Sequence, residues 1–409
     1  IGFSEGFHDA AVAVVNNGKI CYATHSERYS KIKHDKHLDI TAASTAQLLC
    51  HDGTIAFYER PLLKRTRQFF AGQKAWRRQR HLSLKPTQYY SHHKSHAAAA
   101  FQTSPFDEAA IVVVDSIGEW DTTSIWTAEY GDYGKAVYKK RWSQWYPHSI
   151  GLWYSALTKW AGLRPLDEEY IFMGMAAFGN PVHMNVVERQ LHKNNHKGAR
   201  LGDYDKCDIA KSAERILQLE LNNIFARAAQ YSKHICYGGG VALNCVVNTG
   251  LREMYNMWIM PCPGDAGGAL GAACLAYGGK VDFSPYLGYN IQKFCDPRRV
   301  VDGLLEKRVV GVANGRAEFG PRALGNRSLL ADPRQAETKD LVNNIKKRDL
   351  FRPFAPAILE EHCQDYFDMP KQSRYMSYVY KCKQPRAIPA CIHVDGLSLI
   401  HISEPTRPY

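Results

Sequence analysis

The hydrophobic residues of the chain form short β-branched runs separated by segments with helical spacing. Two such runs flank Asn16-Asn17-Gly18 within residues 10–24. Asn-Gly suits a two-residue hairpin turn because both positions can take positive φ, so this segment predicts a β-hairpin. The run Ala109–Asp115 predicts a buried strand with a carboxylate at its tip. Apolar side chains within residues 208–228 recur on one face of a long helix.

Two further apolar runs, His234–Tyr237 and Val309–Ala313, are each followed by glycine. Strands and helices therefore alternate, and the predicted fold class is α/β. At the usual ~150 residues per domain, a chain of 409 residues predicts two or three domains.

Composition excludes several classes of protein. The 45% of hydrophobic residues is enough to bury large cores, which excludes a wholly disordered chain. No apolar run reaches the ~18–20 residues that cross a bilayer, and no secretion leader is evident. The eleven cysteines are scattered without a C-x-x-C pair, which favours reduced thiols. We therefore expect a cytoplasmic protein without membrane contact.

The basic residues are unevenly distributed. The net charge is +12, and nine basic residues but no acid occur between Arg60 and Lys85, a segment we call the basic stripe. Such a run is most often a solvated helical face, and it could also contact RNA or an anionic acceptor. No signature of an RNA-binding domain accompanies it.

Three groups of residues could carry chemistry. Ser91 is a good N-cap for a helix in which His92 and His96, at i and i+4, project from one face and could chelate a metal ion. A pair of ordinary surface histidines is the alternative. Asp115, together with Asp265 at the start of a small-residue helix, would complete a donor set that suits iron, manganese or zinc.

Glycine-rich turns follow two of the predicted strands, around Gly118 and around Gly239, Gly240 and Asn244. Such turns let backbone N–H groups approach a nucleotide phosphate closely. The segments Gly315–Ser328 and Lys346–Pro356 hold several arginines among glycines and prolines. Arginine suits bidentate recognition of phosphate, although a structural arginine–carboxylate network could account for some of them.

Together these stretches resemble the carbamoyltransferases of the nodulation and antibiotic-biosynthesis type, which carbamoylate hydroxyl groups. The matching stretches keep one collinear order over residues 1–396. They are Phe7–Ala11, Ser26–Tyr29, His92–His96, Ser104–Ala109, Pro147–Gly151, Glu169–Gly174, Gly239–Asn244, Gly264–Ala273, Gly320–Ser328 and Phe351–Pro356.

The resemblance implies a Kae1-like domain of the actin/Hsp70 type over residues 1–298, built from two ribonuclease-H-like halves. It implies the start of a YrdC-like α/β domain over residues 299–396. In such enzymes ATP and carbamoyl phosphate give carbamoyl-adenylate in the second domain. The first domain, with a bound metal, then passes the carbamoyl group to a hydroxyl.

The resemblance also assigns roles to residues, which we retain as expectations. His8 acts as general base or orients the acceptor, with Asp9 beside it. A divalent metal ion, Fe(II) in the first place with Mn, Zn and Mg as alternatives, is held by His92, His96, Asp115 and Asp265. The nucleotide is lined by Gly118, Gly239, Gly240 and Asn244. The phosphates of ATP and carbamoyl phosphate are bound by Arg322, Lys346 and Arg352.

The chain departs from the family pattern at two places. Where the family commonly has a run of acids before an Arg-aromatic pair, this chain has His25–Tyr29. Where the family commonly has Asp-Gly, this chain has Asp115-Ser116, so the shape of the phosphate loop can differ from that of the family. The similarity ends at Gly396, and residues 397–409 can be back-translated as a sequencing adapter. We therefore expect residues 397–409 to be non-native, the YrdC-like domain to be incomplete, and this chain to be inactive in adenylation.

The expected acceptor is a hydroxyl of a sugar-containing small molecule or glycan, and the protein could form a homodimer. A relative that modifies adenosine in tRNA is a second hypothesis, favoured by the basic stripe and opposed by the motifs Gly320–Ser328 and Phe351–Pro356. A nucleotide-binding module without transfer chemistry is a third hypothesis. Nucleic acid is not an expected partner.

Overall fold

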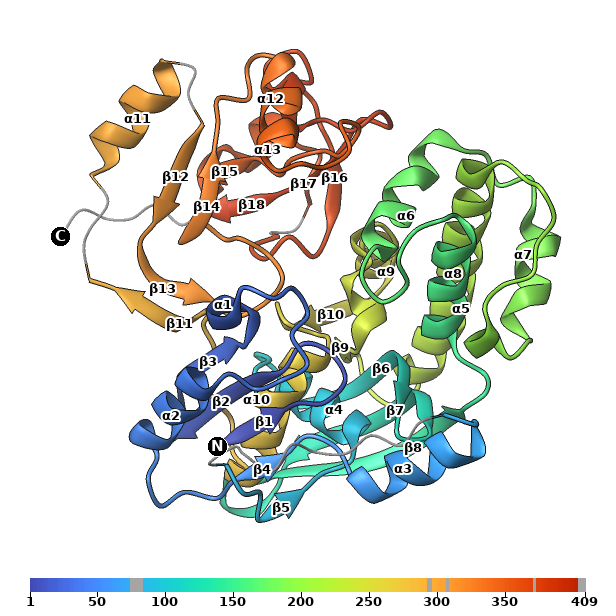
Figure 1. The fold of residues 1–409 in the computed structure, drawn as a ribbon, viewed down its shortest axis with the longest axis vertical. Helices are drawn as coiled ribbons and strands as arrows, with labels where there is room; N and C mark the ends of the chain where they lie inside the picture. The colour runs from blue at the N-terminus through green and yellow to red at the C-terminus, as the bar shows by residue number, and fades with distance from the viewer. Residues whose placement is uncertain (74–83, 293–295, 307–308, 371–372, 404–409) are drawn as a thin grey trace.

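Two five-stranded sheets with the same topology form the centre of the molecule in the computed structural model (Figure 1). The structure describes residues 1–73, 84–292, 296–306, 309–370 and 373–403. In the order β3-β2-β1-β4-β5, the first sheet contains β1 (Gly2–Ser4), β2 (Ala11–Asn16), β3 (Lys19–His25), β4 (Ala56–Phe57) and β5 (Gln88–Tyr89). In the order β8-β7-β6-β9-β10, the second sheet contains β6 (Glu108–Gly118), β7 (Asp121–Tyr130), β8 (Ala136–Trp145), β9 (His234–Gly238) and β10 (Asn256–Ile259).

The directions of the strands repeat as well. β1, β2 and β3 pair antiparallel, whereas β1, β4 and β5 pair parallel. In the second sheet β6, β7 and β8 pair antiparallel, whereas β6, β9 and β10 pair parallel. The first part of the chain is therefore a structural duplication.

The predicted strands and the hairpin are confirmed. β2 and β3 join through Asn17 and Gly18, which take φ values of 49° and 77° as the turn requires. β6 is longer than predicted, and its register with β7 shifts after Val114. Asp115 thus lies in an irregular segment near the end of the strand, where its side chain can turn away from the ladder.

Two helices lie between the sheets and contact each other. α4 (His92–Gln102) contacts β6 and β9, and α10 (Asp265–Tyr277) contacts β1 and β2. Their backbones approach so closely that a Cβ atom on Gly271 would overlap the carbonyl oxygen of Ser95. The run of glycine and alanine at the start of α10 is what allows this approach.

Other helices cover the outer faces. α2 (Ile40–Leu49) contacts β2 and β3 of the first sheet, and α3 (Pro61–Phe70) follows β4. The second sheet is covered by α5 (Ile150–Trp160) and α8 (Lys206–Ala229). Against α8 pack α6 (Glu169–Met175), α7 (Met184–Leu191) and α9 (Cys245–Met254) (Figure 1). α8 confirms the long helix predicted over residues 208–228. Its buried face packs into a core that includes Trp153, Phe172 and Phe225.

The rest of the chain forms a smaller unit of short paired strands above the first sheet (Figure 1). It contains α11 (Pro297–Leu305), β12 (Val310–Ala313), β13 (Gly315–Glu318), β14 (Arg327–Leu330), α12 (Glu337–Ile345), β15 (Ala357–Leu359), α13 (Cys363–Tyr366), β16 (Val379–Lys381), β17 (Leu397–Leu399) and β18 (His401–Ser403). β11 (Tyr286–Ile291) pairs with β13 across the predicted boundary at residue 298. The predicted domain limits stay predictions.

Part of the segment expected to be non-native adopts defined structure. β17 pairs with β16, β18 pairs with β15, and Ile400 between them is fully buried. Residues 404–409 lie outside the described part, and the expectation for 397–409 stays a prediction. Among the described residues, no helix is both long enough and apolar enough to cross a membrane.

Candidate metal and transfer site

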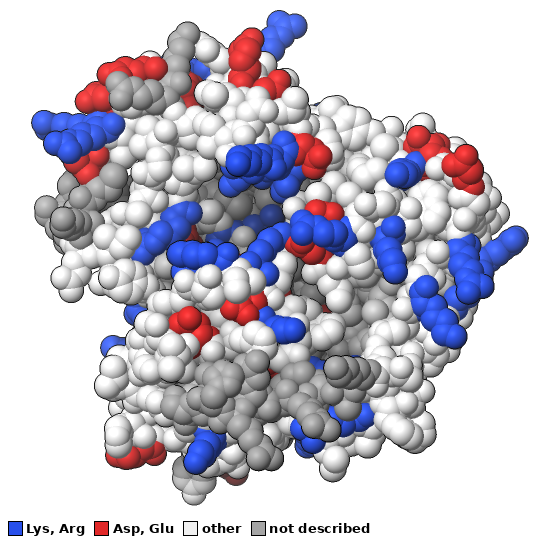
Figure 2. Space-filling model, viewed as in Figure 1, with Lys and Arg blue, Asp and Glu red and all other residues white. Residues whose placement is uncertain are grey.

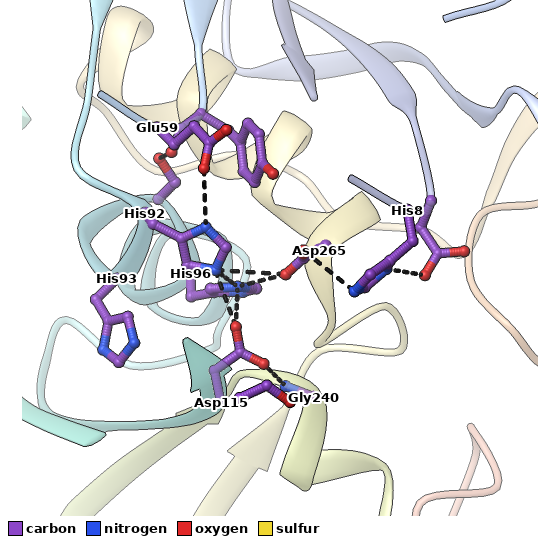
Figure 3. Close-up of polar contacts among 12 residues, drawn as sticks. His8, Glu59, His92, His93, His96, Asp115, Gly240 and Asp265 are labelled. Atoms are coloured by element: carbon purple, nitrogen blue, oxygen red, sulfur yellow. Dashed lines mark hydrogen bonds and ion pairs between the residues drawn. The ribbon is translucent and has the colours of Figure 1, made fainter. Parts of the chain in front are cut away.

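Four buried side chains converge where α4, β6 and α10 meet (Figure 3). Each of His92, His96, Asp115 and Asp265 offers a donor atom, and these atoms lie within 4.8 Å of one another. His92 Nε2 lies 3.0 Å from His96 Nε2 and 2.9 Å from Asp115 Oδ2. Asp265 Oδ1 lies 3.4 Å from both imidazole nitrogens.

Electrostatics ties these four groups together. Burial acts to lower the pKa of His92, but the Asp265 carboxylate and the hydrogen bond to Asp115 outweigh it and raise this pKa well above its usual value. Burial acts to raise the pKa of Asp265, and the positive charges of His92 and His8 outweigh it and lower this pKa. Two buried carboxylates side by side need positive charge nearby.

The cluster fits a transition-metal ion. Its donor set is two imidazole nitrogens and two carboxylate oxygens, which suits iron, manganese and zinc. Metal–ligand bonds of about 2.0–2.2 Å place neighbouring ligand atoms roughly 3.0–3.5 Å apart, close to the separations seen here. The sequence-based choice of His92 and His96 over ordinary surface histidines is supported by their burial, since both are at most 2% exposed.

A chain of alternating histidines and acids, joined by one ion-pair contact and then by hydrogen bonds, leads away from this cluster. His8 Nε2 lies 3.6 Å from Asp265 Oδ2, and His8 Nδ1 lies 2.8 Å from Asp9 Oδ2. The other oxygen of Asp9 lies 2.7 Å from His34 Nδ1, and His34 Nε2 lies 3.0 Å from Asp167. Lys33 also pairs with Asp167. Two imidazoles thus fix the Asp9 carboxylate, which in turn orients His8.

These charges also set the protonation of His8. Burial acts to lower its pKa, but the Asp265 carboxylate and the hydrogen bond to Asp9 raise it to about 9. His8 is therefore an imidazolium at neutral pH when no cation offsets the charge of Asp265. A positive ion bound at Asp265 would reduce the largest of the raising contributions.

One cavity of about 1370 Å³ joins most of the predicted site residues. Its lining includes two groups of residues. His8, Asp9, Asp115, Gly240, Asn244 and Asp265 come from the part of the chain that holds the two sheets, and we call them the acidic wall. Arg322, Lys346, Lys347, Arg348 and Arg352 come from the C-terminal unit, and we call them the basic wall. Figure 2 shows blue side chains gathered around a hollow on this face of the molecule. His92 and His96 lie buried behind Asp115 and Asp265.

The basic wall has an excess of positive charge. The C-terminal unit contributes five cationic side chains to the cavity lining but one acidic side chain, Asp349. Burial, and then the neighbouring Arg352, lowers the pKa of Arg348 to about 10. Burial, Arg348 and Arg352 lower the pKa of Lys346 as well. Arg352 stacks on Tyr170 and donates to its hydroxyl at 3.3 Å, and Arg348 stacks on Phe354 while its Nε donates to Asn343 Oδ1. Such crowded cations are stabilised by an anion.

Not every predicted residue lies in the cavity. Gly239 has φ 91° and packs on the backbone of Val114, where a Cβ would overlap the carbonyl oxygen. Gly118 packs against the His92 ring, so its lack of a side chain makes room for the imidazole. Neither glycine lines the cavity with Gly240 and Asn244.

The arginines of the second motif divide into two kinds. Arg316 donates to the carbonyl oxygens of Cys21, Leu287 and Gly288, and Arg327 donates to those of Tyr289, Asn314, Gly315 and Asn326. Both arginines therefore have a structural role. The motif predicts a structural network with carboxylates as the alternative to phosphate binding, but the acceptors here are backbone carbonyls. Arg322 faces the cavity.

The basic stripe is only partly a solvated face. Lys64 and Arg67 on α3 are 5% and 6% exposed, whereas Arg65 is exposed. Lys74, Arg77, Arg78 and Arg80 lie outside the described residues. Lys64 and Arg67 thus lie in the interior of the molecule, a placement that the charge run alone did not suggest.

Sequence reasoning missed four residues beside the site: His34, Asp167, Glu59 and Glu119. Glu119 has an unusual backbone, with φ 49°, and its buried carboxylate accepts the N–H of Arg60 at 2.6 Å. Burial raises its pKa to about 7, and the bond from Arg60 only partly offsets this. The Lys-His pair at 33–34, close to the matched stretch Ser26–Tyr29, was the available signal for His34.

Glu119→Gln should make the metal-free chain more stable at alkaline pH. An unfolded Glu releases its proton near pH 4.5, whereas folded Glu119 keeps it until about 7, so stability falls as pH rises through this window. The accumulated loss is on the order of 3 kcal/mol above pH 8, and Gln, which stays neutral, avoids it. Urea unfolding at pH 5 and pH 8.5 tests this. A constant difference between wild type and variant would contradict it.

Comparisons with known proteins match most of the chain. The family model described as Carbamoyltransferase N-terminus matches residues 56–204 and 192–274, and that described as Carbamoyltransferase C-terminus matches residues 301–404. The uncharacterized protein sll1178 of Synechocystis sp. is 32% identical over 499 aligned positions, which cover 95% of this chain and 80% of that protein. Nodulation protein NolNO of Sinorhizobium fredii is 28% identical, with 95% and 68% covered. Nodulation protein NolO of Bradyrhizobium diazoefficiens is 30% identical, with 78% and 68% covered.

Proposed function

Since the chain belongs to the carbamoyltransferase family, we propose that it moves a carbamoyl group from carbamoyl phosphate, through carbamoyl-adenylate formed with ATP, to a hydroxyl of a sugar-containing molecule. The observation that carries the proposal is the cavity of about 1370 Å³, whose lining combines carboxylates of the metal-type cluster with the cations of the basic wall. The basic wall suits the phosphates of both co-substrates, and the acidic wall suits transfer. We further propose that residues 1–298 are Kae1-like, which the duplicated sheets support, and that the following unit is YrdC-like.

The residues of the acidic wall suit the transfer step. The acceptor oxygen attacks the carbamoyl carbon, the bond from that carbon to the AMP oxygen breaks, and AMP leaves. His8, whose Nδ1 lies 2.8 Å from Asp9, would take the hydroxyl proton on Nε2. His92, His96, Asp115 and Asp265 would hold a divalent ion, Fe(II), Mn, Zn or Mg, which when bound supplies positive charge for the carbonyl oxygen. Gly240 and Asn244 line the same wall and suit the nucleotide.

The family match favours this function over the hypothesis of a tRNA-modifying relative, because the C-terminal model covers residues 301–404 as well. The test uses a version of the protein with a complete YrdC-like domain, because we expect the present chain to be inactive in adenylation. It is incubated with ATP, carbamoyl phosphate and a panel of hydroxyl acceptors, followed by mass spectrometry of the acceptor. Addition of a carbamoyl group that requires both co-substrates is the expected result. Carbamoylation without ATP would contradict the adenylate route.

Arg322→Gln and Arg352→Gln should each weaken carbamoyl phosphate binding roughly 10- to 100-fold. A charge-assisted hydrogen bond to phosphate contributes about 1.5–3 kcal/mol, and Gln keeps size without charge. Isothermal calorimetry with this chain measures the affinity. Arg141→Gln on β8, outside the cavity lining, is the matched control. Equal affinities in all four proteins would remove the phosphate assignment.

A further inference from the structure

A buried ion pair lies behind the metal-type cluster and has no role in the transfer described above. Glu59 follows β4, and its carboxylate Oε1 accepts from Lys64 Nζ of α3 at 2.7 Å. The side chains are 2% and 6% exposed. Burying two charges costs free energy that their attraction offsets only in part, so such a pair is weak evidence for a stabilising role.

The second carboxylate oxygen of Glu59 faces His92. Oε2 lies 3.9 Å from His92 Nδ1, an ion-pair distance longer than a hydrogen bond. Nδ1 itself is buried without a hydrogen-bond partner in the described structure. Figure 3 shows Glu59 on the side of the His92 ring opposite Asp115, so the two ring nitrogens face different carboxylates.

The faces of the His92 ring are also fixed. The Tyr58 ring packs against the His92 ring, with centroids 5.2 Å apart. Gly118 also lies against the His92 ring, so closely that a Cβ atom on Gly118 would overlap it. The Tyr58 carbonyl accepts from Ser95 Oγ at 2.8 Å, which links the Glu59 segment to α4. With the ring held in this position, a metal ion that takes the place of the proton on Nε2 leaves the remaining proton on Nδ1, toward Glu59.

We propose that Glu59 is a positioning residue that draws the proton of His92 to Nδ1 and so leaves Nε2 free to bind the metal ion, with Lys64 holding the Glu59 carboxylate in place. The inference rests on the proposed metal site. Carboxylates that accept from the outer nitrogen of a metal-binding histidine typically change metal affinity 10- to 100-fold when they are removed. One member of the basic stripe thereby has a function inside the molecule.

The test is Mn²⁺ and Zn²⁺ affinity of this chain, measured by competition with a chromophoric chelator. Glu59→Gln should weaken binding 10- to 100-fold. Because that change leaves Lys64 buried without its partner carboxylate, the double change Glu59→Gln with Lys64→Met provides a second variant. The double change keeps the side-chain volumes and the net charge of the wild-type chain. A loss of metal affinity in this variant therefore reflects the missing Glu59 carboxylate beside His92 and not a change in net charge.

Glu119→Gln is the matched control, because it removes another buried carboxylate whose charge acts on His92. The expected pattern is a 10- to 100-fold loss in the Glu59→Gln/Lys64→Met variant, little loss in Glu119→Gln, and an unchanged melting temperature of the metal-free double variant. Wild-type affinity in the folded double variant overturns the proposal, as does equal loss in Glu119→Gln. If the wild-type chain binds no ion, both the metal site and this inference are overturned. If binding is lost when His92 and His96 are replaced but is retained in the Glu59 variants, this inference alone is overturned.

Discussion

Replacing His92 and His96 together by alanine should abolish stoichiometric binding of a divalent ion to the chain. The two imidazoles supply both nitrogen ligands, and their Nε2 atoms lie 3.0 Å apart in a buried cluster. Two remaining carboxylates leave a site of the kind that binds Ca²⁺ or Mg²⁺ weakly through oxygen. We expect affinity for Zn²⁺ or Mn²⁺ to fall by at least ~1000-fold, which corresponds to about 4 kcal/mol. Equilibrium dialysis with elemental analysis measures the stoichiometry.

Two controls accompany this experiment. His51→Ala removes an imidazole that, unlike the buried pair, is 88% exposed to solvent. This change should leave metal binding intact. His92→Gln with His96→Gln tests whether loss of packing in the small-residue interior explains the result. Unchanged stoichiometry in a folded double variant would refute the ligand assignment.

The substitution Gly271→Ala should destabilise the chain by roughly 3–5 kcal/mol. A methyl group at this position would overlap the Ser95 carbonyl, a backbone atom that no side-chain rotation can move. α10 and α4 would have to separate, and with them Asp265 and the pair His92 and His96. We therefore also expect weaker metal binding. Urea unfolding monitored by circular dichroism measures the free energy of unfolding.

Gly174→Ala provides the matched control for this change. Gly174 also lies in a helix, α6, but a Cβ there would meet only the Phe351 ring at 3.6 Å, an ordinary contact. Alanine should stabilise that helix by up to about 1 kcal/mol. If Gly271→Ala were equally harmless, the close approach of α4 and α10 would be wrong.

Local features of the fold were predictable from sequence. Asn17 and Gly18 specify the hairpin because few residues take positive φ without strain. The β-branched run before Asp115 and the apolar face of residues 208–228 specify a strand and a helix through their periodicity. The spacing of His92 and His96 places both side chains on one helical face, whatever the rest of the chain does.

Contacts between distant segments were decided by the tertiary structure. Residue type and spacing alone could not distinguish Arg322, which lines the cavity, from Arg316 and Arg327, which donate to backbone carbonyls, because all three lie among glycines in one motif. The resemblance to the family was what singled out Arg322. The charge pattern likewise gave no reason to place Lys64 in the interior, since a basic run usually marks a solvated face.

The chain by itself therefore determined the fold class, the local elements and the residue types of the site, because turn chemistry and helical spacing act over a few neighbouring residues. The motifs predict that Asp265 joins His92, but only the packing of α4 against α10 brings them together. Only the tertiary structure decided that Asp9 lies between His8 and His34, and that the basic wall of the C-terminal unit lines the same cavity as the acidic wall. These outcomes depend on burial and on electrostatic partners far apart in sequence, which no local pattern records.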